Sequence, residues 1–124
     1  MEEIILTIQE VYEKINGDYE DVLTRLPREE LVKKFAVKFL DDPSFDQLVK
    51  ALEEDNQEEA FRAAHTLKGV CMNLGFKILY KSTYNITEAL RPGNPNISKD
   101  ELHNLFKQLD KDYNIVINGI KELD

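Results

Sequence analysis

Apolar residues recur every three or four positions along nearly all of this 124-residue chain. Such spacing places side chains on one face of an α-helix, whereas a half-buried strand would alternate strictly. No segment alternates convincingly, and the length suits one domain with one core. The sequence therefore predicts an all-α fold in a single domain, residues 1–124. The final segment shows the pattern best, with Leu102, Leu105, Phe106, Leu109, Tyr113, Val116, Ile120 and Leu123.

Breaks between the periodic segments divide the chain into seven predicted helices. Asn16-Gly17 and Pro27 are typical helix stops, and 91–96 is rich in proline and glycine. Gly75 stands where a left-handed C-terminal residue is expected. Ser98 is the expected N-cap of the last helix, with Glu101 completing a capping box. The predicted helices cover about 4–15, 19–26, 28–41, 45–52, 57–74, 76–91 and 98–123.

The lengths of these segments favour an antiparallel, up-down four-helix bundle. The expected bundle helices are the four longest after residue 26, so that 28–123 forms the bundle core. Residues 1–26 would supply additional short N-terminal helices that cap one end or pack along the side. The bundle helices are then 28–41, 57–74, 76–91 and 98–123.

Composition narrows the classes of function. Sixteen basic and twenty-four acidic residues give a formal charge of -8, which argues against nucleic acid or an anionic membrane surface as a partner. The first residues, 1–6, lack a basic leader and a signal-peptide run, so we expect a cytoplasmic protein. Cys71 is the single cysteine, and its core-type helical position predicts a buried, unreactive thiol.

The segment 65–69, which reads His-Thr-Leu-Lys-Gly, concentrates chemical groups inside a predicted helix. At about 100° per residue, His65 points about 150° away from the centre of the core face. Lys68, Gly69, Met72 and Phe61 gather around it through three- and four-residue steps. We call these five residues the His65 face. A glycine there weakens a helix by about 1 kcal/mol relative to alanine, which suggests that something must come close.

A simpler interpretation makes His65 a surface histidine on a solvated helix, with Phe61 packed against the N-terminal helices. That interpretation leaves Gly69 unexplained, together with two large apolar side chains, Phe61 and Met72, on an exposed face. We therefore favour a functional role for the His65 face. A metal site is not expected, because His65 and His103 are the two histidines and neither belongs to a spaced ligand cluster. The chain also lacks a glycine-rich nucleotide loop.

The segment from His65 to Gly75 closely resembles the signature of histidine-containing phosphotransfer (HPt) domains, and the resemblance extends over about 18–91. It implies that His65 is phosphorylated, that Lys68 stabilises charge on the phosphoryl oxygens, and that Gly69 leaves clearance for a partner. Some members place an imidazole-orienting glutamine twenty-two residues after the histidine. The corresponding residue here is Thr87, whose hydroxyl could take that role.

The resemblance also implies a function in two-component signalling. His65 would accept a phosphoryl group from a receiver-domain aspartate in a multistep phosphorelay and pass it to another receiver. The chain would be a phosphoryl carrier rather than an independent enzyme. It would have no cofactor of its own, because Mg²⁺ would come with the receiver. The expected partners are response-regulator receivers or a hybrid histidine kinase, docking over Phe61 and Met72 on a monomer.

Two alternatives remain open at this point. The chain could resemble the phosphoacceptor domain of a chemotaxis kinase, whose fold is related. It could also be a helical interaction module that binds receivers or other signalling domains through the same face without being phosphorylated. Transfer of phosphate to His65 would support the phosphorelay function over the non-phosphorylated interaction module.

Overall fold

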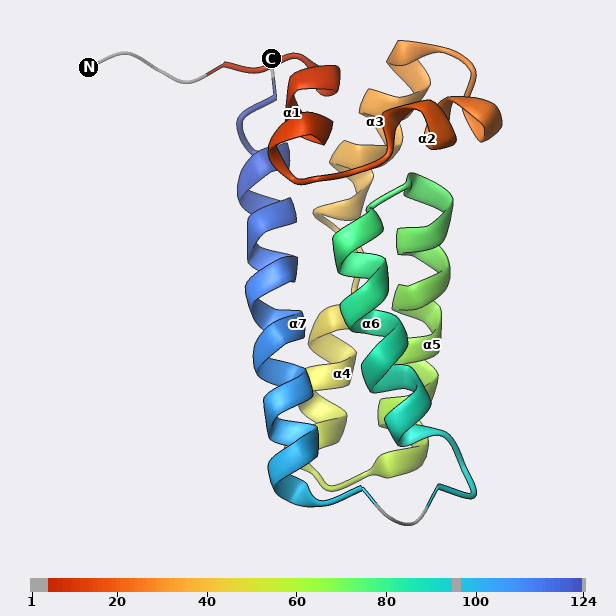
Figure 1. Ribbon diagram of the computed structural model, residues 1–124, viewed down its shortest axis with the longest axis vertical. Helices are drawn as coiled ribbons and strands as arrows, with labels where there is room; N and C mark the ends of the chain where they lie inside the picture. Colours follow the sequence, from red (N-terminus) through yellow and green to blue (C-terminus); the bar gives the residue numbers. More distant parts are fainter. Residues whose placement is uncertain (1–4, 95–96, 124) are drawn as a thin grey trace, which may run out of the picture.

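A computed structural model describes residues 5–94 and 97–123, and all regular elements within them are helices (Figure 1). An isolated bridge pairs Leu6 with Leu123, near the two ends of the described chain. The predicted all-α class is confirmed. The helices are α1 (Ile8–Lys14), α2 (Tyr19–Arg25), α3 (Glu29–Phe39), α4 (Ser44–Glu53), α5 (Gln57–Leu74), α6 (Lys77–Leu90) and α7 (Lys99–Ile120).

Helices α4, α5, α6 and α7 lie side by side along the long axis of the molecule (Figure 1). Helix α5 packs between α4 and α6, and α6 packs against α7. Short connections join α4 to α5 and α5 to α6, so consecutive helices run in opposite directions. This is the antiparallel bundle that the sequence predicted.

One bundle helix differs from the prediction. We expected 28–41 in the bundle and 45–52 outside it, but α4 is the helix that packs extensively on α5. Helix α3 lies beyond α4, towards the end of the molecule formed by α1 and α2 (Figure 1). The physical reason is the break at residues 41–43, which divides this side of the bundle between two short helices. Segments 28–41 and 45–52 both carry an apolar stripe, so the prediction chose between them by length, and the longer segment was the wrong choice.

Aromatic side chains fill the space between α4 and α7. The Phe45 ring of α4 stacks on the Tyr113 ring of α7, with ring centroids 3.9 Å apart and planes 6° apart. Phe106 also stacks with Phe45, with ring centroids 5.9 Å apart, and Phe39 meets Tyr113 edge-on at 5.9 Å. Stacked and edge-on aromatic pairs of this kind contribute beyond their buried area, so they close the bundle where α3 gives way to α4.

The structure shows how the N-termini of α1 and α7 are capped. Helix α1 begins at Ile8 rather than near residue 4, which lies outside the described residues. Its N-cap is Thr7, which forms a reciprocal capping box with Glu10. Ser98 caps α7 as predicted, and its hydroxyl accepts a hydrogen bond from the Glu101 amide at 3.0 Å. The side chains of both caps satisfy amides that the helix itself leaves free.

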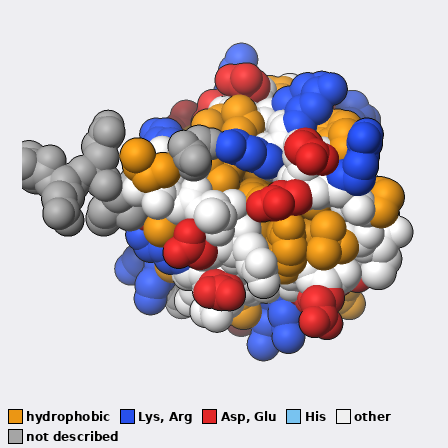
Figure 2. All heavy atoms as spheres, turned by 90° about the horizontal axis from the view of Figure 1, so that it is seen from above, with side chains coloured by type: hydrophobic (Ala, Val, Ile, Leu, Met, Phe, Trp, Pro, Cys, Tyr) orange, Lys and Arg blue, Asp and Glu red, His pale blue; other side chains and the backbone are white. Residues whose placement is uncertain are grey.

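The N-terminal helices fasten the C-terminal end of α5. The Tyr12 hydroxyl of α1 donates to the Leu74 carbonyl at 2.6 Å. The Arg25 guanidinium of α2 donates to the carbonyls of Asn73 and Met72 at 3.0 and 2.9 Å. These carbonyls belong to the last turn of α5, where the helix runs out of its own amide donors. The Met72 carbonyl also accepts a longer hydrogen bond, of 3.3 Å, from the Gly75 amide. The end of the molecule that these helices cover carries charged side chains of both signs around smaller hydrophobic areas (Figure 2).

Candidate functional site

Helix α5, which carries the His65 face, has the bounds that the sequence predicted. Asn56 is its N-cap and accepts a hydrogen bond from the Glu59 amide at 3.2 Å. Gly75 follows its last residue in the left-handed conformation, with a φ of 67°. A polar cap and a left-handed glycine are the usual signals for the two ends of a helix. The position of His65 within α5 is therefore held from both sides.

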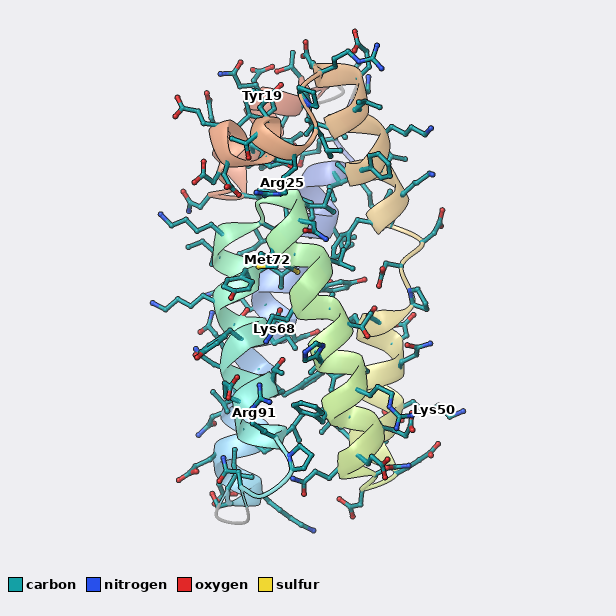
Figure 3. All side chains as sticks on the ribbon, turned by 90° about the vertical axis from the view of Figure 1, so that its right-hand side faces the viewer. Tyr19, Arg25, Lys50, Lys68, Met72 and Arg91 are labelled. Carbon is teal, nitrogen blue, oxygen red and sulfur yellow. The ribbon has the colours of Figure 1, made fainter. Side chains whose placement is uncertain are left out.

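The side chains of α5 divide between core and surface as the helical wheel predicts. His65 is exposed, Met72 is 54% exposed, and Phe61, Lys68 and Gly69 are partly buried. Figure 3 shows Lys68 and Met72 on the same side of the molecule. The orientation of the histidine is thus shown by the structure. The buried residues of α5 are Ala60, Ala63, Ala64, Leu67, Cys71 and Leu74.

Gly69 has open space in front of it. A Cβ atom at this position would meet no side chain, and no backbone outside its own helix, within 4 Å. Nothing among the described residues of the chain therefore requires a glycine here, although glycine weakens a helix interior by roughly 0.5–1 kcal/mol. The open space fits the expected clearance for a partner.

Helix α6 and its C-cap add three side chains to the site that the sequence did not lead us to predict, Tyr84, Glu88 and Arg91. The Lys68 ammonium lies 5.7 Å from the centre of the Tyr84 ring. The Arg91 guanidinium lies 5.3 Å from the Phe61 ring, and the Phe61 ring lies 5.8 Å from the His65 imidazole. Because α5 and α6 are antiparallel, these contacts place Glu88 at the level of His65.

Glu88 introduces a negative charge beside the histidine. Both of its carboxylate oxygens accept hydrogen bonds from Arg91, at 2.8 and 2.9 Å. These hydrogen bonds lower the pKa of Glu88, and the positive charges of Arg91 and Lys68 lower it further. Glu88 is therefore ionised near neutral pH, within electrostatic range of both His65 and Lys68. The signal in the sequence was the position of Glu88 on the outer face of α6.

Thr87 lies on the inner face of α6. Its side chain is fully buried, and its hydroxyl donates to the Thr83 carbonyl at 2.7 Å. Ser82 and Thr83 bond in the same way to the Leu79 carbonyl, which is how buried hydroxyls are satisfied within a helix. Among the described residues, no hydrogen bond joins Thr87 to His65. Its orienting role remains a prediction without a contact in its support.

The other candidate groups lie apart from the His65 face. Cys71 is fully buried, and burial raises the pKa of its thiol far above the ordinary value, as expected for an unreactive cysteine. His103 is exposed on α7 and lines a cleft with Val49, Leu52 and Phe106.

Within residues 5–94 and 97–123, no group of three or more His, Cys, Asp and Glu side chains could hold a metal ion. No helix in these ranges is long and apolar enough to cross a membrane.

The fold and the exposed histidine define a helical phosphotransfer domain, and comparison with known families agrees. The family model of the Hpt domain matches residues 39–117. The chain belongs to this family and is a histidine phosphotransfer domain of the kind used in two-component phosphorelays. The match differs from the resemblance over 18–91, because it omits α2 and all of α3 except Phe39, and takes in most of α7. It spans the four bundle helices, in agreement with the place of α4.

One relative among curated proteins is the chemotaxis protein CheA of Bacillus subtilis (strain 168), which is 38% identical over 72 residues. These residues make up 56% of this chain and 10% of CheA. The chain thus spans about a tenth of the length of that relative. No solved structure matches the chain.

Proposed function

We propose that His65 is the phosphoacceptor of this domain and that the chain carries phosphoryl groups between two receiver domains in a multistep phosphorelay. One observation carries the proposal: His65 is exposed in the middle of α5, with Lys68 one turn away and open space over Gly69. Lys68 supplies positive charge, and the open space admits a second protein. The Hpt family match gives the chemistry that such an arrangement serves.

The proposed step is an in-line transfer to a neutral imidazole. A lone pair on one ring nitrogen of His65 forms the N–P bond while the P–O bond to the receiver's aspartate breaks. The aspartate leaves with the electron pair as a carboxylate, and the other ring nitrogen keeps its proton. The step needs the neutral form of the imidazole, in which this nitrogen carries the lone pair, and histidine is the side chain that ordinarily changes its charge in the physiological pH range. The reverse reaction passes the phosphoryl group to the next receiver.

Phosphoryl transfer depends mainly on position and charge neutralisation. Lys68 provides part of the neutralisation, and its present contact is with the Tyr84 ring, which is 44% exposed. A contact between a cation and a solvated ring is weak, on the order of 0.5–1 kcal/mol. A phosphoryl group can therefore draw the ammonium away. The remaining positive charge, as Mg²⁺, would come with the receiver, so that the chain needs no cofactor of its own. It acts as a carrier rather than as an independent enzyme.

The partner would dock on the His65 face. Met72 is exposed beyond Lys68 and Gly69, and Phe61 flanks the imidazole on the other side. Both offer apolar contact area around the reacting atom, and we assign them to partner binding. The partners would be response-regulator receivers or a hybrid histidine kinase in the cytoplasm, with the chain acting as a monomer.

The test is phosphotransfer from a phosphorylated receiver in the presence of Mg²⁺. We expect acid-labile, alkali-stable phosphate on the chain, lost completely in His65→Ala. The matched control is His103→Ala, which removes the other exposed histidine from α7 and should leave labelling unchanged. A receiver that binds the chain without transferring label would instead support a non-phosphorylated interaction module.

The relationship to CheA favours a second candidate, in which the chain is the phosphoacceptor of a chemotaxis kinase. The donor would then be the ATP of a kinase domain rather than an aspartyl phosphate. Labelling with ATP and a chemotaxis kinase domain lacking its own phosphoacceptor distinguishes the two. Rapid labelling from the kinase with none from receivers supports the second candidate, and the opposite result supports the relay.

A further inference from the structure

Arg91 has an unusual set of partners for a surface arginine. It is the C-cap of α6, with its side chain 47% exposed. Its guanidinium binds both oxygens of Glu88 and at the same time lies over one face of Phe61. Phe61 in turn contacts the His65 imidazole. Figure 3 shows Arg91 and Lys68 on the same side of the molecule. One aromatic ring thus links the arginine to the proposed phosphoacceptor.

Phosphorylation of His65 would change the charge balance at this point. A phosphoryl group carries a charge of about -2 at neutral pH and three strong acceptor oxygens. Glu88, which is ionised and within electrostatic range of His65, would repel it. The guanidinium fork of an arginine matches phosphoryl oxygens as well as it matches a carboxylate. The greater negative charge then makes the phosphoryl group the stronger partner for the arginine.

We propose that Arg91 is a second phosphoryl-binding cation, which Glu88 holds while His65 is unmodified and which changes partner when His65 is phosphorylated. The inference rests on the proposed function, because it needs a phosphoryl group on His65. Arg91 can move without disturbing the core, since it stands beyond the last residue of α6 and its side chain is partly in solvent. Glu88 thereby screens the arginine until the phosphoryl group arrives.

Another arginine near His65 is engaged differently. Arg62 lies one turn before the histidine on α5, but it binds two carboxylates of its own helix, Glu58 at 3.1 Å and Glu59 at 2.8 Å. Both carboxylates stand further from His65 along α5 than Arg62 does. Among the described residues, Arg91 has one carboxylate partner, Glu88, and that partner is the one brought beside His65. The exchange is therefore favoured at Arg91.

The experiment uses the whole chain, phosphorylated with phosphoramidate. A ring nitrogen of His65 forms the N–P bond as the bond from phosphorus to ammonia breaks, and ammonia leaves. The ³¹P signal of the product is followed against pH in the wild type, Arg91→Ala and Glu88→Gln. Arg28→Ala is the matched control, because Arg28 is an exposed arginine at the start of α3. The Nε–Hε signal of Arg91 is recorded by NMR before and after phosphorylation.

If Arg91 binds the phosphoryl group, its loss moves the midpoint of the ³¹P titration to higher pH by about half a unit, because a nearby cation favours the dianion. Glu88→Gln moves the midpoint the opposite way, and Arg28→Ala leaves it in place. The Arg91 signal should respond to Glu88→Gln before phosphorylation and hardly at all afterwards. A structural role for Arg91 would not produce this loss of response.

Two outcomes overturn the inference in distinguishable ways. If His65 carries phosphate but the Arg91 signal keeps its dependence on Glu88, or the midpoint does not move in Arg91→Ala, the arginine does not change partner and the proposed function stands. A second Hpt domain, phosphorylated under the same conditions, is the positive control. If its histidine is labelled and His65 is not, the proposed function fails as well.

Discussion

Two glycines of the same helix region meet opposite surroundings. Gly69 lies in the middle of α5, and a Cβ atom there would find open space. Gly75 lies at the C-terminal end of α5, has a φ of 67°, and its Cβ atom would come within 2.7 Å of the Asp18 carbonyl oxygen. The described part of the chain requires glycine at position 75 and gives no structural reason for it at position 69.

The difference extends to everything around the two positions. The end of α5 is bound by Tyr12, by Arg25 and by the Asp18 amide, which donates to the Gly75 carbonyl at 2.8 Å. The middle of α5 has weak contacts on its exposed side, between cations and aromatic rings. A helix fixed at its end and open at its middle can present a reactive side chain to a partner without itself moving.

The largest expected effect is the loss of stability in Gly75→Ala. The left-handed conformation costs an L-residue about 1–2 kcal/mol, and the contact with backbone adds about 1–3 kcal/mol of overpacking. We expect the free energy of unfolding in urea to fall by about 3 kcal/mol or more. Gly93→Ala is the control, because Gly93 has a φ of 91° and no described atom lies within 4 Å of its added Cβ, and it should lose about 1–2 kcal/mol. Equal losses would show that the Asp18 carbonyl yields to the methyl group.

Next in size is the effect of Lys68→Ala on transfer. Removing a cation from the phosphoryl oxygens should slow transfer to His65 about tenfold, which corresponds to about 1.4 kcal/mol in the barrier. The fold should be retained, because the contact that is lost is the exposed one with Tyr84. Rapid-quench kinetics with a phosphorylated receiver measures the rate. Lys68→Arg should recover part of it, and an unchanged rate in Lys68→Ala would remove Lys68 from the mechanism.

At the fixed end of α5, Tyr12→Phe leaves the Leu74 carbonyl without its partner. We expect a loss of about 1–2 kcal/mol in the free energy of unfolding at pH 7. Tyr84→Phe, at a side chain that is 44% exposed, should change stability by less than about 0.5 kcal/mol. If the two variants unfold alike, the bond from Tyr12 does not fasten the helix.

The same tyrosine predicts a dependence on alkaline pH. Burial, and to a lesser extent the charge of Tyr19, raise the pKa of Tyr12 above its ordinary value. Above about pH 10 the unfolded chain loses this proton while the folded chain keeps it. Stability therefore falls as the pH rises, by up to about 1.4 kcal/mol for each pH unit. Urea unfolding between pH 8 and 11 should show a smaller slope in Tyr12→Phe, and identical slopes would contradict the burial of the hydroxyl.

The sequence predicted features of a single helix well, and features that depend on the packing of two helices poorly. The bounds of α5 and the exposure of His65 were predicted correctly, because helical period and caps are properties of one segment. Glu88 and Arg91 were missed, because their place beside His65 depends on how α6 packs against α5. Counting along the chain selected Thr87, which faces the core. The burial of Thr87 could have been predicted from the inward positions of α6, since Thr83, Ile86 and Leu90 define the buried face. Its orienting role stays a prediction.

The smallest expected change is also the most informative one about the His65 face. Gly69→Ala adds a methyl group in open space and improves helix propensity, so the free energy of unfolding should rise by about 0.5–1 kcal/mol. If Gly69 is clearance for a receiver, the same variant should transfer phosphate more slowly, although its fold is more stable. Gly69→Ser, which is larger and polar, should slow transfer further. A variant that gains stability and keeps the full transfer rate would leave the glycine without a role in docking, and the comparison with Gly75 would then concern the fold alone.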